Sequence, residues 1–259
     1  MIISLLQLDI AFGKPQVNYA AAERKIREAA ALGTDVVILP ELWTTGYDLN
    51  RLAEIADPEG NATKALMSGL ARELGIHIVA GSVASKNSSG ITNTMYVFNR
   101  TGALAGEYSK LHLFRLMDEH LYLHPGEAKG LFTLDGTRCA GLICYDIRFP
   151  EWVRTHTALG AEVLFICAEW PLPRLAHWRA LLISRAIENQ CYVVACNRTG
   201  KDPANTFAGH SLIIDPWGDI VCEASEGEEI LRGKIDLHRV QEIRAQIPIF
   251  TDRRPELYR

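Results

Sequence analysis

Short apolar runs that alternate with segments of helical periodicity constrain the fold of this chain more than any other feature. Asp35-Val36-Val37-Ile38-Leu39 and Val163 to Cys167 are almost wholly apolar, which is typical of strands buried on both faces of a sheet. Between such runs, Gln16 to Leu32 places apolar residues at three- and four-residue spacing, and Ala176 to Gln190 predicts another helix. Alternating strands and helices predict parallel strands with the helices outside the sheet.

Two predicted hairpins interrupt this alternation. They join the apolar runs Ile91 to Phe98 with Ala103 to Tyr108, and Leu131 to Leu134 with Arg138 to Ile143. The sheets are therefore expected to be mixed. Two sheets packed face to face, each covered by helices, fit this pattern, and so does a single large mixed sheet. No low-complexity linker divides the 259 residues, so we expect one α+β domain over 1–259.

Charge and cysteine usage exclude several classes of partner. The formal net charge is −4 and no block of like charge occurs, so neither nucleic acid nor an anionic membrane is an expected partner. No apolar run approaches the roughly 20 residues that span a bilayer. The six cysteines form no CxxC pair, which argues against a disulfide framework or a zinc site. We expect a cytoplasmic protein, since residues 1–9 lack a signal-peptide pattern.

Three residues with catalytic potential each follow a predicted strand. Glu41 comes after the strand that ends at Leu39-Pro40, Lys110 after the strand that ends at Tyr108, and Cys144 after the strand that ends at Ile143. Sites in α/β sheets commonly form at the carboxyl ends of strands, so these three side chains are expected to converge.

The chemistry of the three residues is complementary. A thiol needs a base to attack a carbonyl or nitrile carbon, and a glutamate can supply one. An ammonium stabilises the negative charge that develops, together with the backbone N–H of Tyr145. Taken singly, Cys144 could be a core cysteine, Glu41 a solvated loop carboxylate and Lys110 a surface lysine. Their shared position makes a common site the better interpretation.

The segments around these residues resemble the signature segments of the nitrilase superfamily of carbon–nitrogen hydrolases. They are Pro40-Glu41-Leu42, Glu107-Tyr108-Ser109-Lys110-Leu111-His112-Leu113-Phe114 and Cys144-Tyr145-Asp146-Ile147-Arg148-Phe149-Pro150-Glu151, with further likeness over 185–190 and 209–218. The resemblance covers essentially the whole chain. It implies a four-layer αββα sandwich, Glu41 as general base, Lys110 as oxyanion-stabilising lysine and Cys144 as nucleophile. It also implies a homodimer without metal or organic cofactor.

The resemblance extends to a second glutamate and to a substrate class. Glu119 occupies the expected position of a glutamate that orients Lys110 or the amide, although adjacent Asp118 leaves the register open. Segments 40–47, 114–120 and 168–171 are similar to those of the ω-amidase branch, which includes the 2-oxoglutaramate amidases of bacterial methionine salvage. This implies hydrolysis of the terminal amide of 2-oxoglutaramate or 2-oxosuccinamate through a thioester. Another amidase, an N-carbamoyl amino acid hydrolase, and a catalytically silent binding protein are the alternatives.

Such a substrate has one amide end and one carboxylate end. The residues expected to bind it are Tyr47, Phe114, Tyr145, Arg148 and Trp170, with Arg174 as a further arginine nearby. An arginine binds a carboxylate with two hydrogen bonds, and aromatic residues form apolar walls. Internal pairing of Arg148 with Asp146 or Glu151, a surface position for Arg174 and ordinary core packing of the aromatic residues are the competing interpretations.

Two further features carry expectations. His112 is expected to be structural and not the base of a papain-type triad with Cys144. Residues 247–259 carry apolar side chains without periodicity, which predicts an extended tail that lies across a partner subunit or packs on its own domain.

Overall fold

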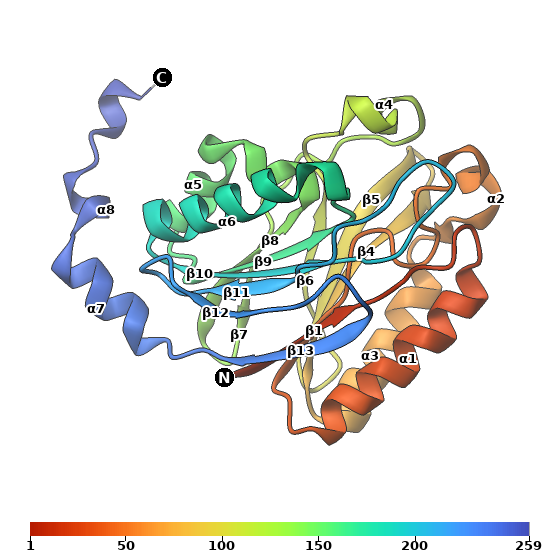
Figure 1. Ribbon diagram of the computed structural model, residues 1–259, viewed down its shortest axis with the longest axis horizontal. Helices are drawn as coiled ribbons and strands as arrows, with labels where there is room; N and C mark the ends of the chain where they lie inside the picture. The colour runs from red at the N-terminus through yellow and green to blue at the C-terminus, as the bar shows by residue number, and fades with distance from the viewer. Residues whose placement is uncertain (259) are drawn as a thin grey trace.

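Two mixed β-sheets stack face to face in the computed structural model, which describes residues 1–258 (Figure 1). The first sheet has the strand order β13-β1-β2-β4-β5-β6, with β3 beside β4, and the second has the order β12-β11-β10-β9-β8-β7. The strands of the first sheet are β1 (Ile2–Gln7), β2 (Val36–Ile38), β3 (Asp57–Pro58), β4 (His77–Asn87), β5 (Gly90–Phe98), β6 (Leu104–Ser109) and β13 (Glu229–Lys234). Those of the second are β7 (Leu131–Leu134), β8 (Thr137–Ile143), β9 (Val163–Ala168), β10 (Tyr192–Asn197), β11 (Leu212–Ile214) and β12 (Ile220–Glu223).

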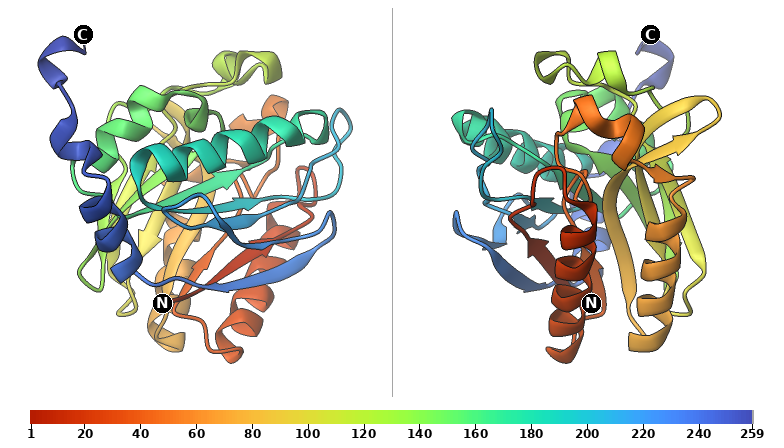
Figure 2. Two further views of the ribbon diagram at one scale, coloured as in Figure 1. Left: turned by 60° about the vertical axis from the view of Figure 1, so that its left-hand side comes forward. Right: turned by 90° about the vertical axis from the view of Figure 1, so that its right-hand side faces the viewer.

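Helices cover the outer face of each sheet. The first sheet carries α1 (Pro15–Ala31) and α3 (Asn61–Leu74), and the second carries α5 (Pro150–Ala158) and α6 (Leu175–Asn189), as Figures 1 and 2 show. The remaining helical segments are α2 (Leu52–Ile55), α4 (Glu119–Tyr122), α7 (His238–Gln246), α8 (Ile249–Asp252), and the 3₁₀ turns η1 (Leu49–Arg51), η2 (Arg115–Met117), η3 (Cys144–Arg148), η4 (Leu172–Arg174) and η5 (Pro255–Leu257). The predicted four-layer αββα sandwich is confirmed, and a single large sheet is excluded.

Side-chain alternation along the strands builds two apolar layers. Ile3 and Leu5 of β1 face the second sheet, whereas Leu6 faces the layer beneath α1 and α3. In β2 the first and last residues, Val36 and Ile38, face the second sheet, and Val37 faces the helices. Because β2 is buried on both faces, every one of its residues is apolar, as the sequence predicted.

The strands that precede the three predicted catalytic residues all run in the same direction within their sheets. In the first sheet β2 is parallel to β4, and two antiparallel pairings through β5 give β6 the direction of β4. In the second sheet β8, β9 and β10 are parallel. Their carboxyl ends therefore open at one end of the sandwich.

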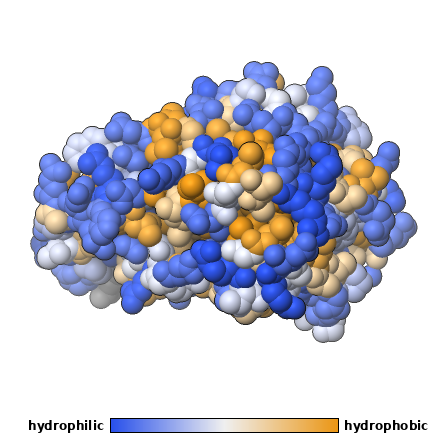
Figure 3. All heavy atoms as spheres, turned by 90° about the horizontal axis from the view of Figure 1, so that it is seen from below, coloured by the Kyte–Doolittle hydropathy of each residue, from blue (hydrophilic) through white to orange (hydrophobic). Residues whose placement is uncertain are grey.

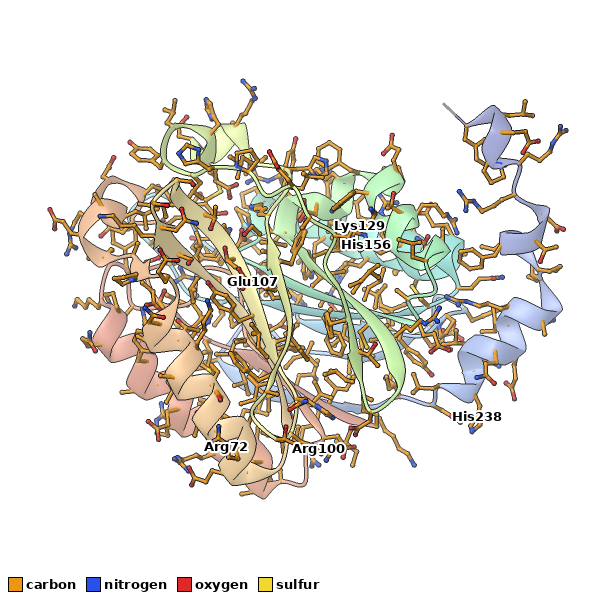
Figure 4. All side chains as sticks on the ribbon, turned by 180° about the vertical axis from the view of Figure 1, so that it is seen from behind. Arg72, Arg100, Glu107, Lys129, His156 and His238 are labelled. Carbon is orange, nitrogen blue, oxygen red and sulfur yellow. The ribbon has the colours of Figure 1, made fainter. Side chains whose placement is uncertain are left out.

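The opposite end is closed by polar contacts between the sheets. Arg100, in the turn between β5 and β6, places its Nη2 atom 2.5 Å from Oδ2 of Asp135, in the turn between β7 and β8. Arg72 of α3 lies at the same end of the first sheet (Figure 4). It donates a hydrogen bond to the carbonyl of Thr101. The sheets are thus fixed together away from the catalytic end.

An early and a late strand of the chain meet in the first sheet. Strand β13 pairs antiparallel with β1 over its whole length, from Ile2 beside Lys234 to Gln7 beside Glu229. On its other side β1 is parallel to β2. Strand β1 thus becomes an internal strand only through a partner more than two hundred residues away in the chain. A hairpin between β4 and β5, turned at Ser88-Ser89, was not predicted from the sequence.

The C-terminal tail differs from the extended segment that the sequence predicted. After α7 it forms α8 and η5 and projects from the body of the molecule (Figure 1). Phe250 packs under the guanidinium groups of Arg154 and Arg244, while Leu257 and Tyr258 are mostly exposed. Proline and short polar stretches break the tail into single helical turns.

On the face of the molecule seen from below, apolar side chains form patches that polar residues divide (Figure 3).

Candidate active site

The segment Pro40-Glu41-Leu42 is held by an irregularity in the neighbouring strand β4. The pairing of β4 with β5 shifts register between Val79 and Ser82, and Gly81 adopts a φ of +55°. Ser82 donates its N–H to the Pro40 carbonyl (3.1 Å), and its hydroxyl accepts the N–H of Leu42 (3.0 Å). A Cβ on Gly81 would lie 2.0 Å from the Pro40 carbonyl oxygen, so only glycine allows this close approach. Glu41 is thereby fixed by backbone contacts on both sides.

Cys144 is the first residue of η3 and stands on a sharp turn directly after β8. Its φ is +45°, in the left-handed region that residues with a side chain rarely adopt. Such strain is found where the surrounding structure imposes it, often at functional sites. The first N–H groups of η3, including that of Tyr145, have no partner within the turn itself. The side chain of Cys144 is buried and lines a pocket at this end of the sandwich.

A buried carboxylate braces this turn from below. Asp146 accepts hydrogen bonds at Oδ2 from the Tyr108 hydroxyl (2.7 Å) and the Ile143 N–H (3.0 Å). At Oδ1 it accepts the N–H of His112 (3.1 Å) and faces the Nδ1 atom of the same residue (2.8 Å). We call this set the Asp146 brace. It ties the nucleophile turn to β6 and to the loop that follows it.

His112 lies in the loop 110–114 beyond the end of β6 and does not line the pocket that holds Cys144. The imidazole is instead turned to Asp146 and stacks on Phe149 at a centroid distance of 3.7 Å. It thus serves the turn beneath the thiol rather than the thiol itself.

The ammonium of Lys110 lies between two carboxylates, and all three side chains are fully buried. Its Nζ atom is 2.7 Å from Oε1 of Glu41 and 2.6 Å from Oε1 of Glu119. Glu41 also accepts the Nδ2–H of Asn93 (2.8 Å) and, at Oε2, the N–H of Glu169 (2.9 Å). Sequence reasoning did not identify Asn93, because an amide within a strand carries no distinctive signal.

Burial and charge set the resting protonation states. Burial opposes the charge on Lys110, but the carboxylates of Glu119 and Glu41 outweigh it and raise the lysine pKa well above its usual value. Burial, together with the Glu41 carboxylate, raises the pKa of the Cys144 thiol well above normal, and Lys110 offsets only part of this. Cys144 therefore rests as a thiol beside a carboxylate that can take its proton.

The loop after β6 places Glu119 and not Asp118 in the site. Asp118 is exposed, with a φ of +57°, and the turn brings Glu119 inward at the start of α4. Glu119 accepts hydrogen bonds from the Tyr47 hydroxyl and, at Oε2, from the N–H of Phe114 (2.8 Å). Burial raises the pKa of Glu119, against the lowering effect of Lys110. This resolves the register that the sequence left open.

A single pocket collects the thiol and the side chains expected to bind substrate. It has an empty volume of about 250 Å³. The residues that line it are Tyr47, Phe114, Met117, Cys144, Tyr145, Arg148, Glu169, Trp170, Pro171 and Arg174. The structure thus brings all five predicted binding residues to one place, together with Arg174.

Both arginines are held at this pocket by aromatic rings. The guanidinium carbon of Arg148 lies 4.9 Å from the Trp170 ring, and that of Arg174 lies 5.4 Å from the Phe114 ring. Arg148 contacts Nδ1 of His177 (3.3 Å), and no ion pair with a carboxylate is formed by either arginine within residues 1–258. Two cationic groups therefore border the pocket with their charges free for an anion.

Glu169 is a charged pocket residue that sequence reasoning did not single out. It follows β9 directly, as Glu41 follows β2, so a charged residue after a buried strand was the available signal. The side chain is fully buried and its Oε2 atom accepts a hydrogen bond from Nη1 of Arg198 (3.1 Å).

Within residues 1–258, no group of three or more His, Cys, Asp and Glu side chains is arranged to hold a metal ion. None of the helices described combines the length and the apolar character needed to cross a membrane.

The αββα sandwich and the thiol beside a buried Glu–Lys–Glu cluster are the arrangement expected of a hydrolase with a cysteine nucleophile. The family model described as carbon-nitrogen hydrolase matches residues 2–245. The chain belongs to the carbon–nitrogen hydrolase family, as its sequence resemblance indicated.

Relatives of known activity and structure are similar over their whole length. The 2-oxoglutaramate amidase of Bacillus subtilis (strain 168) is 57% identical over 256 residues, which cover 99% of this chain and 98% of that protein. The omega-amidase NIT2 of Homo sapiens is 34% identical, over 99% of this chain and 96% of that protein. A CN-hydrolase superfamily protein of Xanthomonas campestris, crystallised with an arsenic adduct in its active site, superposes with a TM-score of 0.92 at 32% identity, covering 98% of this chain and 97% of its own.

Proposed function

We propose that this enzyme is an ω-amidase that hydrolyses the terminal amide of 2-oxoglutaramate, and of 2-oxosuccinamate, to the 2-oxo dicarboxylic acid and ammonia. One observation carries the proposal: the pocket above Cys144 is bordered by the unpaired cations of Arg148 and Arg174. A pocket with a buried nucleophile and a cationic border fits a small molecule with an amide at one end and a carboxylate at the other. The names of the relatives from Bacillus subtilis and Homo sapiens support the same substrate class.

The first half of the proposed reaction forms a thioester. As Sγ of Cys144 bonds to the amide carbon, the thiol proton passes to the Glu41 carboxylate. The oxyanion is stabilised by Nζ of Lys110 and the N–H of Tyr145. When the tetrahedral intermediate collapses, the C–N bond breaks, and Glu41 returns its proton to the departing ammonia.

The second half releases the acid. A water molecule attacks the thioester carbon through its oxygen, and Glu41 takes a proton from that water. Nζ of Lys110 and the N–H of Tyr145 again stabilise the oxyanion. The C–S bond then breaks and the sulfur regains a proton from Glu41, which restores the resting thiol. Glu119 acts throughout as the anionic partner that holds Lys110, and its own position depends on Tyr47 and the Phe114 N–H.

A substrate panel tests the proposal. Ammonia release is measured with ω-amides of 2-oxo acids, simple nitriles and N-carbamoyl amino acids, and the intact protein is weighed by mass spectrometry after rapid quenching. We expect the highest kcat/KM with 2-oxoglutaramate and an acyl adduct on Cys144 that is absent from Cys144→Ala. Fastest turnover of a nitrile or an N-carbamoyl compound would overturn the assignment. Binding without adduct or ammonia would identify a silent binding protein.

The wider setting follows as part of the same proposal. We place the enzyme in the cytoplasm and in bacterial methionine salvage, as a single domain over 1–259. Its six cysteines are free, and five of them are buried. We also propose a homodimer in which residues 247–259 lie against the partner, since Ile247, Leu257 and Tyr258 expose apolar surface. Light scattering at micromolar concentration tests the dimer, and a monomeric mass would contradict it.

A further inference from the structure

Glu169 places a carboxyl group in the wall of the pocket that holds the nucleophile. It lies at the carboxyl end of β9, beside β8, the strand that leads to Cys144. Its backbone N–H contacts Glu41, and its side chain is fully buried. In the mechanism above this side chain has no role.

Of the carboxyl oxygens of the three buried glutamates of this site, one has no hydrogen-bond donor. Both oxygens of Glu41 and both oxygens of Glu119 accept at least one hydrogen bond. Oε2 of Glu169 accepts one from Arg198, whose other terminal nitrogen, Nη2, is 2.9 Å from the Ile10 carbonyl. Oε1 of Glu169 has no partner among the described residues 1–258. A buried polar atom without a partner is costly unless a ligand supplies one.

The surroundings favour a proton on this oxygen. An ionised oxygen without a donor is more costly to bury than a neutral carboxyl. Burial raises the pKa of Glu169 to about 8, with Glu41 adding to the rise and Arg198 opposing it. At neutral pH the carboxyl group is therefore mostly protonated. Since Oε2 is occupied as an acceptor by Arg198, the proton resides on Oε1.

We propose that Glu169 is a specificity-determining residue whose neutral Oε1–H donates a hydrogen bond to the 2-oxo oxygen of the substrate. This inference rests on the proposed function. The other polar groups of such a substrate already have partners in that mechanism: the amide carbonyl has Lys110 and the N–H of Tyr145, and the carboxylate has the two arginines. The 2-oxo oxygen is the acceptor that remains, and Oε1 is the donor that remains. A neutral donor also avoids a further negative charge beside an anionic substrate.

The assignment predicts a dependence of KM on pH. Above pH about 8 the proton is lost, so the donor disappears and a negative charge enters the pocket wall. Both effects weaken the binding of an anionic 2-oxo amide, so its KM is expected to rise. The ionisable groups that face Glu169 or share this pocket are Arg198, Glu41, Asp202, Tyr47, Cys144, Tyr145, Arg148 and Arg174.

Two matched variants separate the donor from the charge. Glu169→Gln and Glu169→Met both remove the ionisable carboxyl group beside Arg198, but only glutamine keeps a neutral N–H donor. The substrates are 2-oxoglutaramate and the monoamide of glutaric acid, which differs only in lacking the 2-oxo oxygen. The measured quantity is the ratio of kcat/KM for the two compounds, which does not depend on how much of each variant is folded.

We expect the wild-type enzyme and Glu169→Gln to prefer the 2-oxo compound by similar factors, and Glu169→Met to lose about tenfold or more of that preference. We also expect the alkaline rise in KM to be absent from Glu169→Gln. An unchanged ratio in Glu169→Met, or the same rise in Glu169→Gln, overturns the inference while the proposed function stands. A wild-type enzyme that releases ammonia from neither compound overturns the proposed function itself.

Discussion

Replacing Asp146 by asparagine removes one acceptor oxygen of the Asp146 brace without changing its shape. Each carboxylate oxygen accepts one backbone N–H, that of Ile143 at Oδ2 and that of His112 at Oδ1, and asparagine offers a single oxygen. Whichever way the amide turns, its NH₂ group faces a backbone N–H that has lost its acceptor. A buried donor left without a partner costs about 1–3 kcal/mol, so the free energy of unfolding should fall by about that amount.

Two assays read this change. Urea unfolding at a fixed protein concentration gives the loss of stability, and a thermal scan should show a midpoint lower by about 2 to 12 °C for a chain of this size. Quenched-flow mass spectrometry gives the rate of acyl-enzyme formation. Because Ile143 precedes the nucleophile, a shift of about 1 Å in the turn should slow acylation about 100-fold.

The control is Asp219→Asn, which alters an exposed carboxylate in the turn before β12. It should change the stability by no more than about 0.5 kcal/mol. The reasoning fails if the Asp146 variant unfolds within about 1 kcal/mol of the wild type and forms the acyl-enzyme at the wild-type rate.

Three further substitutions test the rest of the site. Lys110→Met leaves two buried carboxylates facing each other, so we expect the free energy of unfolding in urea to fall by about 3–5 kcal/mol and ammonia release to be undetectable. Activity near the wild-type level would contradict the role of Lys110 in stabilising the oxyanion. Gly81→Ala should lower the melting temperature and slow acylation, because its Cβ meets the Pro40 carbonyl at 2.0 Å. The control is Gly33→Ala, because Gly33 also has a positive φ but has open space where the Cβ would lie. This control should be destabilised only by the backbone strain, by roughly 1 kcal/mol, and equal effects of the two substitutions would refute the steric argument. His112→Asn should still form the acyl-enzyme within about tenfold of the wild-type rate, and its loss would restore a histidine-dependent mechanism.

The layers of the fold could be predicted because its strands and helices have distinct periodicities. Strands such as β2 are buried on both faces and read as continuous apolar runs, and α1 shows the spacing of a helix with one buried side. What the sequence left open was the number of sheets, since a strand's apolar faces do not specify which sheet covers them. The tail was predicted as extended because its helices are single turns, too short to establish a periodicity.

The site was predictable to the extent that its residues follow strands. Glu41, Lys110 and Cys144 share that position, and parallel strand directions bring them together. Glu169 has the same position and was overlooked, since its partner Arg198 is distant in the sequence. Asp146 also depends on contacts from another strand, so its role as a brace is visible only in three dimensions.

The pairing of β1 with β13 has a consequence for biosynthesis. While a ribosome extends the chain, one edge of β1 stays open until residues 229–234 have been made, more than two hundred residues later. An unpaired apolar edge can recruit other chains, and contacts between distant residues form slowly. The nascent protein is therefore exposed to misassociation throughout this interval, and the edge is protected only when β13 pairs with it. Chaperone binding should persist on truncated chains that end before β13 and be released once that strand is included.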